Sequence, residues 1–173
     1  MIISSLLSAQ EKGDYQWLFG YNYHPDPGIE SYKYDFNGDT MEIEADIGIG
    51  LEFRGSNTSI CDENGDLLFY TNGCQVANRH HELMPNGIGI NEGYFIEEFL
   101  NGNCEGYLGV QEIIALQDPA NWTGYYIIHK SVEYDTVINE LYLNQLRYSY
   151  IDLLWRHTKQ ALLALVILIK MNL

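Results

Sequence analysis

The stretch CDENGDLLFYTNG (61–73) sets a short run of strand-forming residues between two Asn-Gly pairs. Asn-Gly is the strongest two-residue signal for a β-hairpin, because both residues tolerate positive φ angles. The two pairs therefore predict two successive turns and a three-stranded antiparallel meander over residues 57–80. The middle strand, residues 67–70, is mostly apolar, so we expect it to be buried on both faces.

The same acidic loop has an alternative reading as a cation site, because Asp62, Asn64 and Asp66 offer side-chain oxygens at alternating positions. A calcium-binding EF-hand loop also requires Gly at its sixth position and Glu at its twelfth. Counted from Asp62, those positions hold Leu67 and Gly73. We therefore interpret the loop as a structural turn and keep Asp62, Asn64 and Asp66 as weak metal candidates.

The pattern Asp-x-Asn-Gly-Asp occurs twice, at residues 35–39 and 62–66, and the two copies are 27 residues apart. A hairpin signal that returns at this spacing favours repeated small antiparallel sheets. The turn residues expected from these copies and from the pair at 72–73 are Asn37, Gly38, Asn64, Gly65, Asn72 and Gly73.

Short runs of β-branched and aromatic residues alternate with turn clusters throughout residues 15–152. The expected fold is therefore all-β, with antiparallel meanders in one domain. Residues 85–93 and 100–106 are rich in Gly and Asn and are expected to be loops. The expected strands are 15–23, 31–36, 39–50, 57–61, 66–71, 74–81, 109–116, 124–131 and 141–152.

The overall composition narrows the classes of partner. With 46% hydrophobic and 19% charged residues, the 173-residue chain is globular and not disordered. Its formal net charge of −15 repels phosphate groups, which argues against nucleic acids and anionic membrane surfaces as partners. The same acidity permits weak binding of cations.

The two ends of the chain differ from its middle. Residues 1–10 resemble the remnant of a secretory signal peptide, because an apolar run is followed by a small-residue site. Residues 153–173 contain three basic residues, no acidic one and an apolar run of nine, and they predict an atypical helical tail. That run is well short of the ~20 residues that span a bilayer, so we do not expect an integral membrane protein. A shifted reading frame is one interpretation of the tail, and a genuine C-terminal helix on the sheet or a membrane surface is the other.

The three cysteines, Cys61, Cys74 and Cys104, lack the paired spacing of a zinc site. In the expected meander, Cys61 and Cys74 lie on either side of the middle strand, about 9–10 Å apart. A disulfide needs Cα atoms within ~7 Å, which argues against that pair. Cys74 with Cys104 is the candidate disulfide, and three free buried thiols are the alternative.

Other side chains that could carry chemistry have ordinary structural explanations. Glu97 and Glu98 are expected on a strand, where neighbouring side chains point to opposite faces, so we interpret them as solvated charges. His80 and His81 diverge in the same way and have no third metal ligand nearby. His129 lies in an apolar strand, and we expect a hydrogen-bonded core or edge histidine.

An aromatic cluster lies near the start of the domain, at Tyr15, Trp17, Tyr21 and Tyr23. If exposed, these rings could stack on sugars. Because a strand with alternating pattern buries one of its faces, we expect the cluster to belong to the core.

The segment SNTSICDENGDLLFYTNGCQVANRHHELMPNG (56–87) resembles a segment that recurs in large secreted proteins of Bacteroidota. Shorter similar stretches flank it at 17–20, 34–38, 125–129 and 146–152. The resemblance implies the N-terminal β-propeller-like region of a multidomain protein that is secreted by the type IX system or attached to the cell surface. It implies about two blades, fewer than a closed ring needs, and it supplies no catalytic residue.

Together these patterns favour a non-enzymatic interaction or adhesion module, a truncated piece of a secreted or surface protein, with a protein or glycan as partner. No cofactor is expected, and no nucleophile elbow, phosphate loop or dinucleotide fingerprint occurs. Two alternatives stay open. One is a fragment of a propeller-type glycoside hydrolase or lyase with carboxylates in a central channel, and the other is Ca²⁺-assisted glycan binding.

Overall fold

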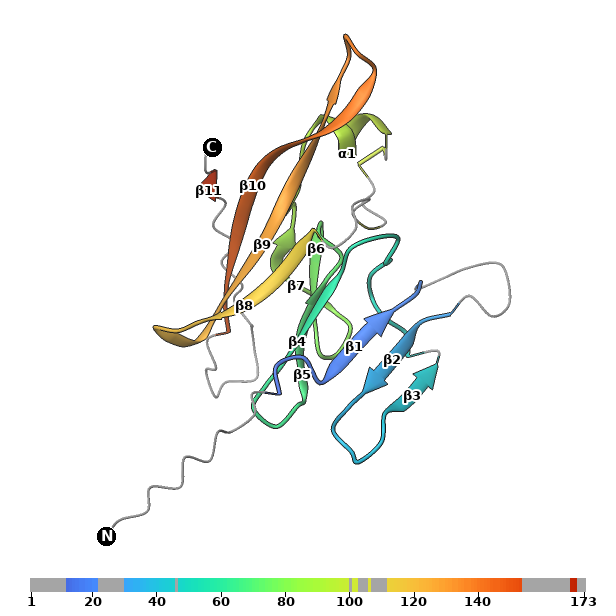
Figure 1. The fold of residues 1–173 in the computed structure, drawn as a ribbon, viewed down its shortest axis with the longest axis vertical. Coiled ribbons are helices and arrows are strands. Elements are labelled where there is room, and N and C mark those ends of the chain that lie inside the picture. Colours follow the sequence, from blue (N-terminus) through green and yellow to red (C-terminus); the bar gives the residue numbers. More distant parts are fainter. Residues whose placement is uncertain are drawn as a thin grey trace.

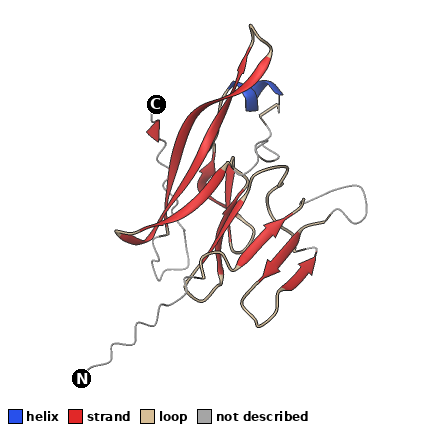
Figure 2. Ribbon diagram, viewed as in Figure 1, coloured by secondary structure: helices blue, strands red, loops and turns tan. Residues whose placement is uncertain are grey.

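The computed structural model describes residues 12–21, 30–45, 47–99, 101–102, 106, 112–153 and 169–170. These residues form three antiparallel β-sheets and one short helix, which confirms the all-β fold class (Figure 2). The expected signal remnant at 1–10 and most of the 100–106 loop lie outside the described residues.

The first sheet, sheet A, contains β1 (Gln16–Phe19), β2 (Tyr32–Asp35) and β3 (Glu42–Ala45) in that order. All of its pairings are antiparallel, and the register places Tyr34 between Trp17 and Ile43. The strands are shorter than the expected runs, because pairing covers only four residues of each.

The second sheet, sheet C, is a four-stranded meander of β4 (Thr58–Cys61), β5 (Leu67–Thr71), β6 (Gln75–Asn78) and β7 (Leu83–Ile88). The three-stranded meander expected over 57–80 is confirmed. The prediction of a loop at 85–93 is wrong for residues 85–88, which belong to β7 and pair with β6. β7 is an edge strand, which tolerates Pro85, and the buried side chain of Met84 fastens it to the core.

The third sheet, sheet D, contains β8 (Ile113–Asp118), β9 (Asn121–Asp135), β10 (Glu140–Asp152) and β11 (Ile169–Lys170), in the order β11-β10-β9-β8. The far half of the β9–β10 hairpin extends beyond β8 and projects from the body of the molecule (Figure 1).

The tail expected to be helical is described only at Leu153 and at 169–170. There the helix expectation is wrong, because Ile169 and Lys170 pair with β10 as a strand. The open edge of β10 offers unpaired backbone groups, and pairing with them satisfies the backbone of a β-branched residue such as Ile169. The rest of the tail lies outside the described residues.

Sheet C is the middle layer of the molecule, with sheets A and D on its two sides (Figure 1). One core cluster joins it to sheet D and includes Phe69, Val76 and Ile127. The other joins it to β1 and the 47–53 loop through residues such as Tyr70 and Leu18. Phe69 and Tyr70 have no exposed surface, which confirms that the middle strand β5 is buried on both faces.

The short helix α1 (Tyr94–Phe99) was not expected from the sequence. Glu97 and Glu98, expected on a strand, lie on this helix and are exposed. Ile96 anchors the helix to the core cluster between sheets C and D. While Ile96 is buried, both carboxylates stay in solvent, so they are solvated charges on a helix and not on a strand.

Candidate functional site

Sheet A turns its aromatic residues away from the rest of the molecule. Leu18 is 1% exposed and packs toward sheet C, whereas Trp17, on the opposite face, is 45% exposed. The expectation that Trp17 belongs to the core is therefore wrong. The strand does alternate, but its buried face carries Leu18 and Gln16 instead. Tyr15 and Tyr21 are half-buried, and Tyr23 lies outside the described residues.

The outward side chains of sheet A form one continuous surface, which we call the aromatic face. Ring centroids lie 5.1 Å apart for Trp17 and Phe36, and 5.2 Å apart for Phe19 and Tyr34. Ile43 extends this surface onto β3 and is 56% exposed. The aromatic face is defined by Trp17, Phe19, Tyr34, Phe36 and Ile43.

The other face of sheet A combines the core residue Leu18 with polar side chains. Lys33 and Glu44 form an ion pair with an N–O distance of 2.6 Å, and Gln16 donates a hydrogen bond of 2.9 Å to Asp35. The side chains of this ion pair are 27% and 60% exposed, so the polar part of this face is itself open to solvent. Sheet A departs from the usual arrangement, in which a sheet buries its apolar face, because its aromatic face is uncovered while Leu18 packs in the core.

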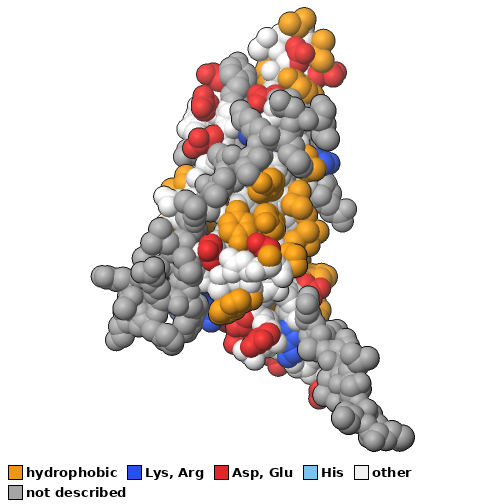
Figure 3. All heavy atoms as spheres, turned by 90° about the vertical axis from the view of Figure 1, so that its left-hand side faces the viewer, with side chains coloured by type: hydrophobic (Ala, Val, Ile, Leu, Met, Phe, Trp, Pro, Cys, Tyr) orange, Lys and Arg blue, Asp and Glu red, His pale blue; other side chains and the backbone are white. Residues whose placement is uncertain are grey.

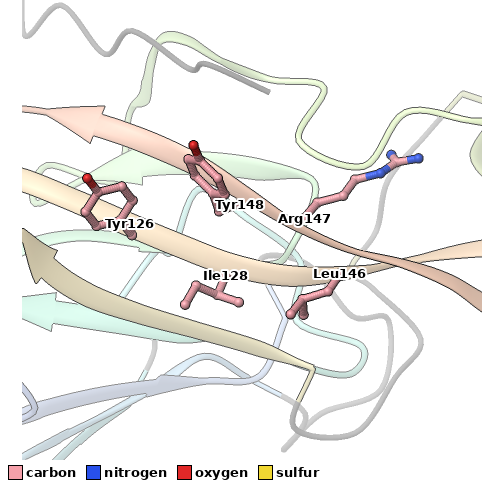
Figure 4. A pocket seen from close by; sticks show the side chains of 5 residues that line it. All are labelled: Tyr126, Ile128, Leu146, Arg147 and Tyr148. Atoms are coloured by element: carbon pink, nitrogen blue, oxygen red, sulfur yellow. The ribbon is translucent and has the colours of Figure 1, made fainter. Parts of the chain in front are cut away.

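Sheet D also exposes an apolar surface. Ile114 is 50% exposed, and the register aligns it with Ile128 and Tyr148 across the sheet. Figure 3 shows the hydrophobic side chains that gather on this side of the molecule. A shallow hollow of about 290 Å³ lies here (Figure 4). It is lined by Tyr126, Ile128, Leu146, Arg147 and Tyr148.

At one end of this surface, beside the turn between β8 and β9, apolar residues give way to a hydrogen-bonded polar cluster. The Tyr150 hydroxyl donates to Asp118 Oδ2 at 3.0 Å and accepts from Asn121 Nδ2 at 3.0 Å. A Cβ at Gly124 would lie 2.0 Å from that hydroxyl, so only glycine leaves room for the Tyr150 side chain. The Tyr126 hydroxyl lies 3.5 Å from the same Asp118 oxygen.

Partial desolvation, together with the Asp118 carboxylate, raises the pKa of Tyr126 and of Tyr150 above the ordinary value. Both phenols are therefore neutral hydrogen-bond donors at physiological pH. The two rings meet edge to face, with centroids 4.9 Å apart.

Two further groups complete this cluster. Thr123 Oγ1 donates to Asp152 Oδ1 at 2.7 Å and lies 2.9 Å from Asn121 Oδ1. Between these residues, Trp122 is 78% exposed, although Gln117 Nε2 holds its carbonyl oxygen at 2.9 Å. We call this group the polar end of sheet D, defined by Asp118, Asn121, Trp122, Thr123, Tyr150 and Asp152.

The acidic loop at 62–66 forms a turn that its own first residue holds together. Asp62 Oδ1 accepts hydrogen bonds from the backbone N–H groups of Asn64 at 2.9 Å and Asp66 at 3.0 Å. Gly65 has a φ of +87°, whereas Asn64 is not among the described residues with positive φ. The turn is therefore a glycine-bulge turn and not the pair of positive-φ residues expected from the sequence.

The two Asp-x-Asn-Gly-Asp copies lie against each other. Asn37 N donates to Asp35 Oδ1 at 2.9 Å, which repeats the bond from Asn64 to Asp62. Asn37 Nδ2 then donates to the carbonyl oxygen of Gly65 at 2.9 Å and so links sheet A to sheet C. Gly38 does not have positive φ, and residues 36–41 form a longer connection than a two-residue hairpin turn.

The turn at Asn72 and Gly73 is buried. Asn72 Oδ1 accepts from the backbone N–H groups of Cys74 and Gln75, and its Nδ2 donates to the Glu52 carbonyl. Gly73 has a φ of +88°.

Within the described part of the chain, no group of three or more His, Cys, Asp or Glu side chains is arranged to hold a metal ion.

His129 is a hydrogen-bonded core residue, as expected. Its Nδ1 lies 2.8 Å from Asn91 Oδ1 and its Nε2 lies 3.1 Å from Ser149 Oγ. Burial, with a smaller contribution from the nearby Arg147 charge, lowers the pKa of His129 to about 4. The imidazole is therefore neutral at physiological pH and ties β9 and β10 to the loop that contains Asn91.

The adjacent pair His80 and His81 has separate environments. His80 is exposed, whereas His81 Nδ1 lies 3.1 Å from the Tyr70 hydroxyl. Tyr70 also accepts a hydrogen bond from Gly50 N at 2.8 Å, and burial raises its pKa to about 12. His81 therefore supports the core between sheets A and C.

The cysteines differ in state. Cys61 is a free buried thiol, and burial raises its pKa to about 11. Cys74 is disulfide-bonded. The expectation that these two do not bond to each other is confirmed, and the alternative of three free thiols is wrong. Cys104, the candidate partner of Cys74, lies outside the described residues.

Comparisons with known proteins identify no relative: no family model, curated protein or solved structure matches the chain. In the part of the chain that the structure describes, no helix has the length and apolar character needed to cross a bilayer.

Sequence reasoning missed the polar end and the apolar surface of sheet D, and it singled out Trp17 but assigned it to the core. The signal for the polar end was a Trp beside carboxamide and hydroxyl side chains immediately after a Pro-Ala turn. Its partners Tyr150 and Asp152 are about thirty residues away along the chain, and only strand pairing brings them together.

Proposed function

We propose that the chain is a non-enzymatic interaction module, a section of a larger β-propeller-like array in a secreted or cell-surface protein. Three antiparallel sheets follow one another in chain order, as the blades of such an array do. Apolar clusters join sheet C to sheet D and to β1 of sheet A. Sheet C, a four-stranded meander, spans almost all of the 56–87 segment that carries the resemblance to Bacteroidota proteins.

The observation that carries the proposal is the exposed aromatic face of sheet A. Its aromatic face is outward, with Trp17 and Ile43 about half exposed, while ion-paired side chains lie on the other face. Exposed apolar area costs roughly 25 cal/mol per Å² relative to burial, so a sheet of this polarity favours a second apolar surface against it. A further β-sheet provides that surface, and the apolar part of sheet D around Ile114 offers the same kind of contact.

The disulfide bond of Cys74 supports a secreted or cell-surface location. A disulfide at this position forms and persists in an oxidising compartment, as outside the cell. The proposed module therefore acts in a secreted or surface-attached protein, and its contacts are with other proteins or with glycans.

Sedimentation velocity of the purified chain tests the proposal. Because Trp17 and Ile43 are exposed, the aromatic face should drive concentration-dependent self-association. The double variant Trp17→Thr and Ile43→Thr should shift the chain toward monomer.

The matched control is Val137→Thr with Ile138→Thr, which removes exposed aliphatic groups from the tip of the β9–β10 hairpin. It should leave association unchanged. A wild-type chain that sediments as one sharp monomer and unfolds cooperatively would count against the proposal, and so would equal effects of the two double variants.

A further inference from the structure

We propose that the open edge of β3 accepts a β-strand from a partner protein, in which basic and apolar side chains alternate. This inference rests on the interaction-module role proposed above and gives the chemistry of the partner. β3 is the outer strand of sheet A (Figure 1), and within the described residues no strand pairs with its far edge. The partner would extend sheet A by one strand, which is a recurrent way in which proteins bind extended peptides.

The first argument is the accessibility of β3. All four of its residues, Glu42–Ala45, are exposed, although the strand pairs along its whole length with β2. In an antiparallel pair only every second residue hydrogen-bonds to its neighbour, so alternate residues of β3 direct their backbone N–H and C=O groups to the open side. By contrast β7, the outer strand of sheet C, contains Pro85, which has no N–H to donate.

The second argument is that one face of β3 is apolar. The register aligns Ile43 with Tyr34, and Ile43 lies on the aromatic face with 56% of its side chain exposed. Ala45 follows two residues later and therefore lies on the same face. Apolar side chains on an added strand would continue this surface and cover part of its exposed area.

The third argument is charge. Glu42 and Glu44 lie on the opposite face of β3, and the register places Glu42 directly across from Asp35. Like charges directly opposite each other destabilise a sheet, and Lys33 is ion-paired with Glu44 instead. A lysine or arginine across from Glu42 on an added strand would offset the repulsion, so this face selects a basic partner.

A second copy of the chain does not fit the same edge. Two copies related by a two-fold axis would pair their β3 strands antiparallel, and the axis maps each face of the sheet onto the same face of its copy. A glutamate of one copy, Glu42 or Glu44, would therefore lie across from a glutamate of the other. Such pairs oppose self-pairing, so the edge favours a different chain. The self-association expected above uses the aromatic face and not this edge.

Fluorescence anisotropy of labelled synthetic peptides tests the inference on the whole chain. The probe is a short peptide in which lysine and valine alternate, and it should bind saturably. One control peptide has glutamate in place of lysine, and the other is the lysine–valine peptide with its backbone amides N-methylated. Each control should bind about tenfold more weakly or not at all, the first through charge and the second through lost backbone hydrogen bonds.

Two charge-reversing variants locate the site. Glu42→Lys should weaken binding of the lysine–valine peptide about tenfold and strengthen binding of the glutamate–valine peptide, because the charge across from the added strand is inverted. The new lysine would face Asp35, so the pairing of β2 with β3 is kept. Glu98→Lys, at an exposed position of α1, changes the net charge equally and should leave both affinities unchanged. Thermal unfolding of each variant checks that the fold is kept.

Hydrogen–deuterium exchange distinguishes strand addition from charge attraction alone. When the lysine–valine peptide is bound, backbone amides of β3 should exchange more slowly, because the added strand accepts hydrogen bonds from those that face the open side. The amides of β7 should exchange as in the free chain.

The inference is overturned if the lysine–valine peptide does not bind, if N-methylation leaves its affinity unchanged, or if Glu98→Lys weakens binding as much as Glu42→Lys. Slower exchange in β7 and not in β3 would overturn it as well. These results are independent of sedimentation. A monomeric chain that binds the peptide at β3 would remove the array and keep the acceptor edge, and a self-associating chain that binds no peptide would do the reverse.

Discussion

Sheets A and C are neighbouring antiparallel meanders of short strands, but they differ in where their apolar residues lie. Sheet C buries both faces of its central strand, with Phe69 toward sheet D and Tyr70 toward sheet A. Sheet A buries only Leu18 and Gln16 of β1 and directs its aromatic side chains outward. Strand formation follows from local sequence, whereas the choice of buried face depends on which neighbours are present to cover it.

Truncation of one aromatic residue in each sheet should give the largest difference in stability between the two sheets. Phe69→Ala should destabilise the fold by about 4 kcal/mol, because it leaves a cavity in a fully buried site. Trp17→Ala should cost about 0.5 kcal/mol or less, because its ring is largely solvated. Urea unfolding monitored by circular dichroism measures both, and similar costs for the two variants would contradict the assignment of buried faces.

The next largest effect is a pH dependence that belongs to the layer between sheets C and D. The pKa of His129 is 6.5 in the unfolded chain and about 4 in the folded chain. Between these pH values the unfolded chain therefore binds a proton that the folded chain does not bind. This contribution is fully present above about pH 6.5 and is lost as pH falls toward 4, by roughly 3 kcal/mol at most.

His129→Gln should flatten the pH dependence of unfolding within that window, and the exposed His80→Gln should not. Urea midpoints between pH 4 and 7 provide the measurement. An unchanged slope in His129→Gln would show that its proton uptake on unfolding is not the source of the dependence.

A smaller effect tests the link between sheets A and C. Gly65→Ala should cost about 2 kcal/mol, because Gly65 has a φ of +87° and a new Cβ would lie 1.9 Å from Asn37 Oδ1. Gly48→Ala is the matched control, since Gly48 has a φ of +62° and nothing lies within 4 Å of its Cβ position. It should cost about 1 kcal/mol, from backbone strain alone. Equal costs would mean that the contact with Asn37 is unimportant.

The strand positions were largely predictable, because Asn-Gly turns and alternating residues are local signals. The turn at Asn64 and Gly65 was placed correctly, although the turn type was not, since Asp62 caps the backbone and leaves only Gly65 with positive φ. β7 was missed because Pro85 and Gly87 suppress the local strand signal, and its pairing with β6 outweighs them.

The candidate sites were less predictable. The burial of Trp17 was predicted wrongly because alternation identifies two faces but does not say which one is covered. The polar end could not be predicted from the sequence, because Asp118 and Tyr150 come into contact only through the pairing of β8, β9 and β10. The contact between the two Asp-x-Asn-Gly-Asp copies, through Asn37, depends in the same way on how sheet A docks on sheet C.

Residue-level footprinting with a photoactivated carbene tests most directly which face of sheet A is outward. The account predicts strong labelling of Trp17 and Ile43 in dilute chain and none of Phe69 and Tyr70. If Trp17 and Ile43 are as protected as Phe69 while Leu18 is labelled, sheet A is turned the other way and the aromatic face is not exposed.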